Sequence, residues 1–337
     1  MTRFHSFDGM RGLAAIAVCV YHATSSQIMP GGYLAVDFFF ILSGFVLARA
    51  YEFDLKTKRY GVGSFMLMRW LRLYPMFFLG LVLASAKAAA FAVYGREASL
   101  TWTQLLLALP SELLMLPSPV NGHDLYPLNG PSWSLFFELL INLVFAAWLF
   151  RQGTRTLLAI AACASVFLVT SAMARGSLDG GWTWPFIWMG AARVTFGFIV
   201  GVLISRSSLK AKPSTFACAL GALALVAVLA VPVSESLRPL YDCAAVLIGF
   251  PFLVIWGASL QPPTRIQTAC AALGALSYPL YATHLPLVVF ARIAVYFAVP
   301  IAIWLPVFCL AICALALWLG RTVDPRLRRL LNAWRPT

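Results

Sequence analysis

The sequence predicts an all-α, polytopic membrane protein with about ten transmembrane helices and both termini in the cytoplasm. Of its 337 residues, 61% are hydrophobic and only 11% are charged, and the mean hydropathy is +0.84. A soluble domain is roughly 45 to 50% apolar and 25% charged. Apolar runs of about 20 residues, the length that crosses a bilayer, recur along the chain. Lys and Arg cluster just beyond the ends of these runs.

A window of about 20 residues places the predicted spans in order. Their approximate limits are 10–29, 32–50, 65–90, 132–150, 156–174, 183–204, 214–231, 239–260, 269–298 and 301–320. The whole chain, 1–337, then forms a single integral-membrane domain with a short basic tail at about 321–337. We expect this tail to lie as a helix against anionic lipid on the cytoplasmic face.

The distribution of Lys and Arg sets the orientation, because cytoplasmic loops carry an excess of these residues. With the N-terminus inside, most of the basic residues fall in inner loops, and the outer side holds only Lys87, Arg96, Arg175 and Arg238. The surplus of 25 Lys and Arg over 12 Asp and Glu therefore follows from topology. We do not expect nucleic-acid binding.

The apolar segment from Trp102 to Leu116 is too short to be counted as a full crossing. Counting it as one would invert the charge pattern of every later loop. We therefore expect an outer-surface or re-entrant helix, carried by the long external stretch from about 91 to 131.

The first span contains Arg11 and His22, eleven residues apart. Three helical turns separate them, so both side chains share one face, about 16 Å apart along the axis. An ionisable group inside a membrane costs ~2.5 to 3.5 kcal/mol on insertion scales and usually faces a protein interior. These two residues therefore indicate a site or pathway. The alternative is that they only bond to carbonyls or to a neighbouring helix.

Two carboxylates are predicted at the depth of His22. Counting from the ends of the spans places His22, Asp37 and Glu138 within roughly 10 Å of the outer interface. A carboxylate beside an imidazole would fix its tautomer for acid-base chemistry. Alternatively, both carboxylates bond to backbone or to interfacial water.

The inner side carries a different chemistry. Arg69 and Arg72 are three residues apart and point the same way from the start of the third span. Guanidinium groups suit phosphates, and Arg11 could add a third positive charge at this mouth. Ordinary positive-inside anchoring would explain Arg69 and Arg72 without any ligand.

The ninth span carries Pro279 and Pro286 around Tyr281 and His284, which predicts a kinked backbone and a polar interior. A histidine near prolines is more often a hydrogen-bonded structural group than a catalyst. The seven cysteines form no ligand cluster with histidine, and we expect no metal site.

Five blocks of the chain resemble acyltransferase family 3, which includes O-antigen and exopolysaccharide acetylases. The blocks are FDGMRGLAAIAVCVYHA, GGYLAVDFFFILSGFVLA, RWLRLYP, NGPSWSLFFELL and LSYPLYATHLPL. They occur in the family's order. The resemblance therefore covers most of the chain.

The resemblance implies an enzyme of the bacterial cytoplasmic (inner) membrane that needs no permanently bound cofactor. Such an enzyme moves an acyl group, usually acetyl, from cytoplasmic acyl-coenzyme A to a hydroxyl of an extracytoplasmic or lipid-linked glycan. The family's roles make His22 the central catalytic residue, Arg11 its companion, and Arg69 with Arg72 part of the coenzyme A side. We expect the stand-alone form, which leaves room for a separate protein that handles the carbohydrate acceptor.

The resulting hypothesis makes His22 a general base, oriented by Asp37 or Glu138, for attack of the sugar hydroxyl on the thioester. An acyl-histidine intermediate is the alternative route.

A rival hypothesis for the function is a proton-coupled transporter that uses His22, Asp37 and Glu138 as a relay. A second rival is a non-catalytic membrane scaffold. The candidates for substrate or oxyanion contacts are Asn129, Trp133, Ser134, Ser277, Tyr281 and His284.

Overall fold

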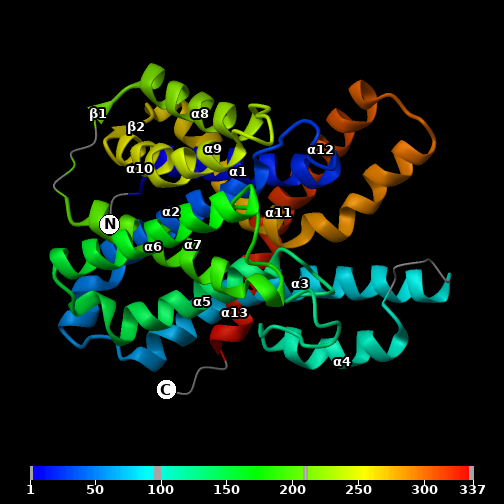
Figure 1. Cartoon of the computed structure of the whole chain (residues 1–337), viewed down its shortest axis with the longest axis horizontal. Coiled ribbons are helices and arrows are strands. Elements are labelled where there is room, and N and C mark those ends of the chain that lie inside the picture. The colour runs from blue at the N-terminus through cyan, green and yellow to red at the C-terminus, as the bar shows by residue number, and fades with distance from the viewer. Residues whose placement is uncertain (1–2, 95–99, 208, 210–211, 334–337) are drawn as a thin grey trace.

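The computed structural model describes residues 3–94, 100–207, 209 and 212–333, which fold almost entirely into helices (Figure 1). This confirms the predicted all-α fold class. The described strands are two residues each, β1 (Lys212–Pro213) and β2 (Leu260–Gln261), and they pair in parallel. The α-helices are α1 (His5–Ala23), α2 (Ala35–Lys56), α3 (Val62–Val93), α4 (Trp102–Leu113), α5 (Ser132–Ala147), α6 (Thr154–Arg175), α7 (Ile187–Ser205), α8 (Thr215–Ala230), α9 (Arg238–Ala244), α10 (Phe250–Ala258), α11 (Thr264–Tyr296), α12 (Ile301–Trp318) and α13 (Asp324–Ala333).

Short 3-10 or π turns extend several of these helices. Each joins or precedes a longer helix, and some of their side chains, such as Leu34, Phe150 and Leu319, are buried in the core. They are η1 (Gly32–Leu34), η2 (Leu149–Arg151), η3 (Trp184–Phe186), η4 (Ala245–Gly249) and η5 (Leu319–Val323).

The predicted spans coincide with helices. Within the described residues, seven helical stretches are long and apolar enough to cross a membrane, and α5 and α8 are shorter apolar helices. Helix α1 carries Asp8 and Arg11 and is not among the seven. The number of crossings and the side of the termini therefore stay predictions.

We call the end of the bundle with 57–61 and 262–263 the inner end, and the end with 24–31 and 114–131 the outer end.

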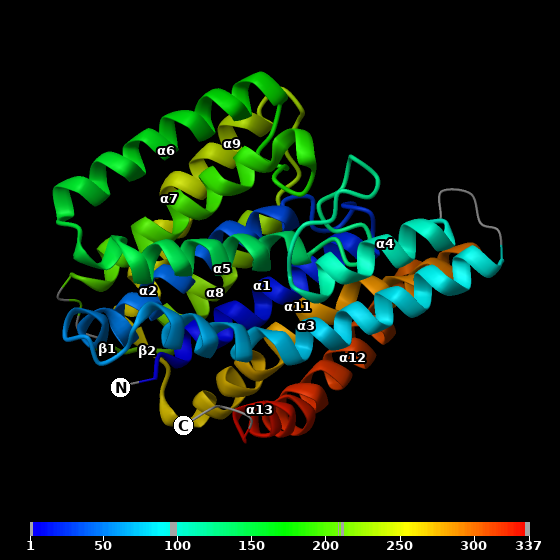
Figure 2. The same ribbon diagram turned by 90° about the horizontal axis from the view of Figure 1, so that it is seen from below.

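Helices α1 and α11 lie along each other at the centre of the molecule, and α3 lies on the other side of α11 (Figure 2). The backbones of α1 and α3 approach that of α11 closely, and this fixes how the three helices are aligned along their axes. A Cβ at Gly12 of α1 would lie 2.6 Å from the carbonyl oxygen of Leu273, and one at Gly80 of α3 would lie 2.1 Å from that of Ala282. Small residues allow such contacts between membrane helices. Polar groups on α1, α3 and α11 are thereby held at fixed relative depths.

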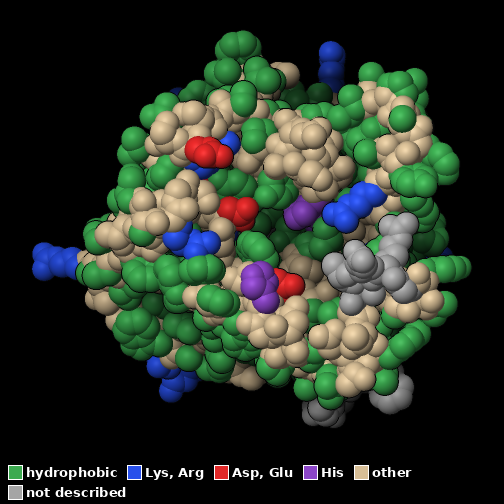
Figure 3. Space-filling view, turned by 45° about the vertical axis from the view of Figure 1, so that its right-hand side comes forward, with side chains coloured by type: hydrophobic (Ala, Val, Ile, Leu, Met, Phe, Trp, Pro, Cys, Tyr) green, Lys and Arg blue, Asp and Glu red, His purple; other side chains and the backbone are tan. Residues whose placement is uncertain are grey.

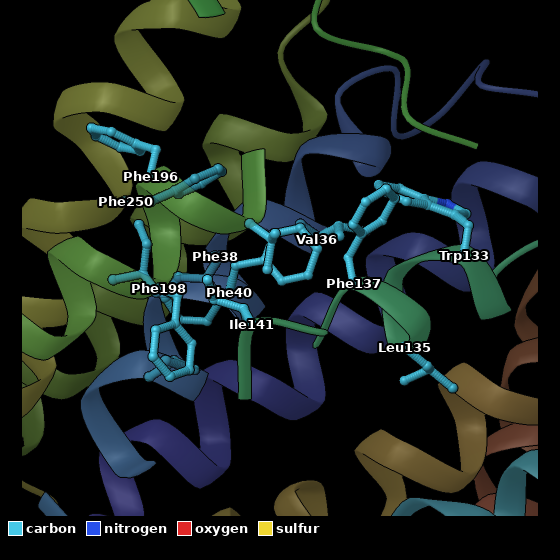
Figure 4. Close-up of a cluster of buried hydrophobic side chains, with 14 of the residues drawn as sticks. Val36, Phe38, Phe40, Trp133, Leu135, Phe137, Ile141, Phe196, Phe198 and Phe250 are labelled. Carbon is cyan, nitrogen blue, oxygen red and sulfur yellow. The ribbon is translucent and has the colours of Figure 1, made fainter. Parts of the chain in front are cut away.

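Helix α2 packs as closely against α7, because a Cβ at Gly44 would lie 2.0 Å from the carbonyl oxygen of Phe198. Around this pair, aromatic side chains from α2, α5, α7 and α10 fill the interior (Figure 4). Phe38, Phe137, Phe198 and Phe250 are each at most 1% exposed. Between membrane helices such rings stabilise the packing through van der Waals contacts, because lipid is as apolar as the protein interior. This cluster supports the α2 and α5 side chains that reach the central cavity.

Helix α4 is only 12 residues long and is not among the membrane-length helices, as expected for the segment from Trp102 to Leu116. Its Glu112 is fully buried and accepts a hydrogen bond from the backbone N–H of Leu128 at 3.0 Å. Burial raises the pKa of Glu112 to about 7. This carboxyl group ties α4 to the chain that leads into α5.

Candidate active site

A cavity of about 180 Å³ lies between the five helices α1, α2, α3, α5 and α11, near the middle of α11. Its polar lining is contributed mainly by arginine, serine and tyrosine side chains and one glutamate, while phenylalanine and leucine side chains of α2 supply much of its apolar wall. Its polar and charged lining residues are Arg11, Ser43, Arg69, Arg72, Ser134, Glu138, Ser277, Tyr278 and Tyr281. The cavity therefore brings together Arg11, predicted from the first span, and the arginine pair predicted at the inner mouth.

Arg11 is held against α11. Its Nε donates to the hydroxyl oxygen of Ser277 at 3.1 Å, and its terminal nitrogen donates to the carbonyl oxygen of Gly274 at 3.1 Å. The carboxylate of Asp8 lies 3.9 Å away, one turn back on α1. These contacts aim a cationic side chain into the cavity and leave about a third of it exposed, so it can still contact a ligand.

Arg69 forms an ion pair with Glu138, with 3.0 Å between the guanidinium nitrogen and Oε1. Ser43 also donates to this oxygen, at 3.1 Å. The Nε of Arg69 is buried and has no hydrogen-bond partner among the residues that the structure describes. An unpaired buried donor costs free energy, and an anionic ligand that reached it would remove this cost. Glu138 therefore orients Arg69. The prediction that Glu138 lies beside His22 is wrong.

Asp37 is also separated from His22. It forms a bidentate ion pair with Arg193 of α7, at 3.0 and 2.6 Å, and both side chains are at most 1% exposed. Arg193 also donates to the carbonyl oxygens of Gly180 and Tyr33. The hydrogen bonds that both oxygens of this carboxylate accept come from Arg193 of α7. The prediction that Asp37 orients His22 is wrong, and the relay required by the transporter hypothesis is not formed.

The side chain that contacts His22 is His284. The Nδ1 of His22 lies 3.3 Å from the Nε2 of His284, and the ring centroids are 5.0 Å apart. His284 is fully buried, one turn beyond Tyr281 on α11. The Tyr281 ring lines the cavity and lies 5.9 Å from the His284 ring, centroid to centroid. The histidine pair thus begins about one helical turn, roughly 4.5 Å, beyond the outer end of the cavity.

Hydrogen bonding assigns the tautomer of both imidazoles. The Nδ1 of His284 lies 2.8 Å from the carbonyl oxygen of Tyr281, which can only accept, so this nitrogen carries the hydrogen. Its Nε2 is then an acceptor. The Nδ1 of His22 faces this acceptor and the carbonyl oxygen of Val18 at 3.0 Å, so it also carries a hydrogen. The Nε2 of His22 is therefore unprotonated, which is the state a general base requires.

The remaining candidates occupy different places. Ser134 and Tyr281 line the cavity, and their hydroxyl oxygens are 2.6 Å apart and share the carbonyl oxygen of Pro131. Asn129 is 1% exposed and donates to the carbonyl oxygen of Ala282, which braces α11. Trp133 lies outside the cavity, with its ring 5.3 Å from the Arg193 guanidinium carbon.

Three charged residues near these groups were given no role by the sequence motifs. Arg193 pairs with Asp37. Asp179, which accepts from the Tyr21 hydroxyl at 3.3 Å, and Arg292 both act electrostatically on His22. Figure 3 shows a face on which charged and histidine side chains gather around a hollow. The signal for Arg193 and Arg292 was their charge inside a predicted span; Asp179 had none.

Comparison with known proteins assigns the family. Residues 4–321 match the family described as acyltransferase domain, so the chain belongs to this family. It is 38% identical over 186 residues to "Protein 2 in picA locus" of Rhizobium radiobacter, covering 50% of this chain and 95% of that protein. It is 28% identical over 267 residues to the exopolysaccharide production protein ExoZ of Rhizobium meliloti, covering 75% of each.

A shorter match joins the chain to the peptidoglycan O-acetyltransferase OatA of Listeria monocytogenes, 37% identical over 81 residues, which are 23% of this chain and 12% of that protein. No solved structure matches the chain. The protein is an acyltransferase whose helices are long and apolar enough for a membrane. This confirms the family that the five sequence blocks resemble.

Proposed function

We propose that the protein transfers an acyl group, normally acetyl, from cytoplasmic acyl-coenzyme A to a hydroxyl of a glycan on the far side of the bacterial cytoplasmic membrane. The observation that carries this proposal is the alignment of an arginine-lined cavity with a histidine pair one turn beyond its outer end. The names of the relatives ExoZ and OatA support a polysaccharide as acceptor.

The donor would enter from the inner end. Its phosphates would face Arg72, which is exposed, and Arg69, whose Nε has no hydrogen-bond partner within the described part of the chain. Guanidinium groups bind phosphate oxygens through charge-assisted hydrogen bonds worth about 1.5 to 3 kcal/mol each. The pantetheine arm would follow the apolar wall that Phe39, Phe40 and Leu42 supply. This path directs the thioester toward Tyr281 and His22.

The acid-base step follows from the tautomer of His22. Its Nε2 accepts the proton of the sugar hydroxyl as the oxygen attacks the thioester carbonyl carbon. The carbon–sulfur bond of the resulting tetrahedral intermediate then breaks, and the leaving sulfur takes the proton back from the imidazolium. His284 keeps the Nδ1 hydrogen of His22 in place throughout, through the 3.3 Å contact. Asp179 supplies negative charge near the imidazolium.

The hydroxyl groups of Ser134 and Tyr281 are the donors best placed to stabilise the oxyanion. They share one hydrogen bond with each other and one with the carbonyl oxygen of Pro131. Rotation of one hydroxyl away from Pro131 directs its hydrogen into the cavity. The oxyanion, being charged, is a stronger acceptor than the carbonyl oxygen that it replaces.

The test is acyl transfer by the purified full chain. Protein in proteoliposomes receives radiolabelled acetyl-coenzyme A and glycans prepared from peptidoglycan, lipopolysaccharide and exopolysaccharide. We expect label in at least one glycan with the wild-type protein and none above background with His22→Ala, at equal expression and equal coenzyme A binding. Transfer by His22→Ala at the wild-type rate would remove the general base from the mechanism.

A further inference from the structure

The helix that follows α12 packs beside the inner end of the cavity. The π turn η5 connects α12 to α13, and a Cβ at Gly320 in this turn would lie 2.3 Å from the carbonyl oxygen of Ala275 on α11. π turns inside helices are frequent at functional sites. Leu327 of α13 packs on the buried cluster that contains Met76 of α3. Helix α13 is thus attached to both α3 and α11, which line the cavity.

The polar residues of α13 divide between two faces. Asp324 is 8% exposed, and Arg328, one turn later and half-buried, donates to it at 2.9 Å from Nε and lies 2.5 Å from it through a terminal nitrogen. At about 100° per residue, Arg328 shares the face of Asp324 and Leu327 that meets the protein. Arg326 and Arg329 are exposed on the other side. The basic helix therefore turns one of its arginines inward.

Arg328, the arginine that faces the protein, interacts electrostatically with residues that line the cavity. Arg72 acts on both Asp324 and Arg328, and Arg328 also interacts with Tyr278. Both Arg72 and Tyr278 line the cavity. Arg72 forms no ion pair with any side chain in the described part of the chain. Two guanidinium groups placed near each other repel, and an anion that contacts both removes this cost.

We propose that Arg328 of α13 is part of the donor site and, together with Arg72, binds a phosphate at the nucleotide end of acyl-coenzyme A. This inference rests on the proposed function and names a binding residue outside the five sequence blocks. Asp324 acts as a positioning residue that holds the Arg328 guanidinium toward the cavity. Arg326 and Arg329 face outward, where lipid phosphates are their partners.

The experiment measures binding of coenzyme A to the full chain in nanodiscs of phosphatidylcholine, by isothermal titration calorimetry. Arg328→Ala is compared with Arg329→Ala, a matched removal of one charge from the same helix. We expect Arg328→Ala to weaken the Kd about tenfold, the loss of one charge-assisted contact, and Arg329→Ala to change it less than twofold. Arg328→Lys should restore part of the affinity, because lysine keeps the positive charge but lacks the planar guanidinium group that can bond a phosphate through two nitrogens.

Two further readouts separate ligand binding from a structural role. Loss of a phosphate contact should make the Kd of Arg328→Ala less sensitive to salt than that of the wild type, whereas misfolding would not. Repeating the titration with 3′-dephospho-coenzyme A shows which phosphate is bound. The variant's thermal unfolding midpoint is recorded in parallel.

The possible results are distinct. Equal affinities and equal salt dependence for Arg328→Ala and Arg329→Ala would overturn the inference. The titrations are repeated in nanodiscs that contain phosphatidylglycerol. If Arg328→Ala weakens coenzyme A binding only in these, the residue contacts lipid, and the inference would also be overturned. Failure of the wild-type protein to bind coenzyme A at all would instead contradict the proposed function.

Discussion

The imidazoles of His22 and His284 face each other between α1 and α11, with 3.3 Å between Nδ1 of the first and Nε2 of the second. The residues are 262 positions apart in the chain. No carboxylate contacts His22 within the described residues, because Asp37 and Glu138 are each paired with an arginine. A neutral imidazole therefore occupies the position that a carboxylate holds in many acid-base pairs, and it fixes the tautomer of His22 without adding charge.

Replacing His284 should lower turnover more than donor affinity. In His284→Ala, the Nδ1 of His22 keeps only the Val18 carbonyl as partner, and we expect kcat to fall by about 10² to 10³, while the KM for acetyl-coenzyme A stays within a few-fold. His284→Asn supplies a side-chain oxygen that can accept from His22 and should recover part of kcat. Steady-state kinetics of the purified variants decide this. A wild-type kcat in His284→Ala would contradict the positioning role.

Asp37 should matter for stability more than for chemistry. Removal of one partner from a buried ion pair leaves an uncompensated charge and costs about 3 to 5 kcal/mol. We expect Asp37→Ala to lower the midpoint of thermal unfolding strongly, and Asp37→Ala combined with Arg193→Met to recover part of the loss. Differential scanning fluorimetry in detergent measures both. A variant with a normal midpoint and no turnover would instead place Asp37 in the catalytic machinery.

Glu112 should make stability depend on pH. Burial raises its pKa from the usual 4.5 to about 7, so the folded state favours the protonated carboxyl group. Its stabilising contribution is fully present below pH 4.5 and is lost as the pH rises through about 7. The difference corresponds to at most roughly 3.5 kcal/mol.

Glu112→Gln stays neutral at every pH and should therefore gain stability relative to the wild type as the pH rises from 5 to 8. Unfolding midpoints measured across this range test the prediction. Parallel curves for the two proteins would show that the carboxyl group does not titrate there.

Much of this architecture could be predicted from the sequence, because hydropathy and basic flanks depend on short segments. The predicted spans coincide with helices, and α4 is as short as its apolar run indicated. Arg11, Arg69 and Arg72 do line one cavity. These three residues were found because charge inside or beside an apolar run is a local signal.

The partners of the charged groups could not be predicted in this way. Counting residues from the end of a span gave Glu138 the depth of His22, but Ser134 already lies level with Tyr281, and Glu138 follows one turn further in. The pairing of Asp37 with Arg193 joins residues 156 positions apart. Such contacts depend on which helices lie side by side, and hydropathy does not encode helix order.

The most direct test of the account is the sidedness of acyl transfer. Proteoliposomes with the protein in known orientation receive radiolabelled acetyl-coenzyme A only at the inner end, and the acceptor glycan only on the opposite side. We predict labelled glycan on the side away from the donor, and none when His22 is replaced by Ala. In a parallel preparation the glycan is supplied only on the donor's side, and label that appears there but not in the first preparation would contradict transfer across the membrane.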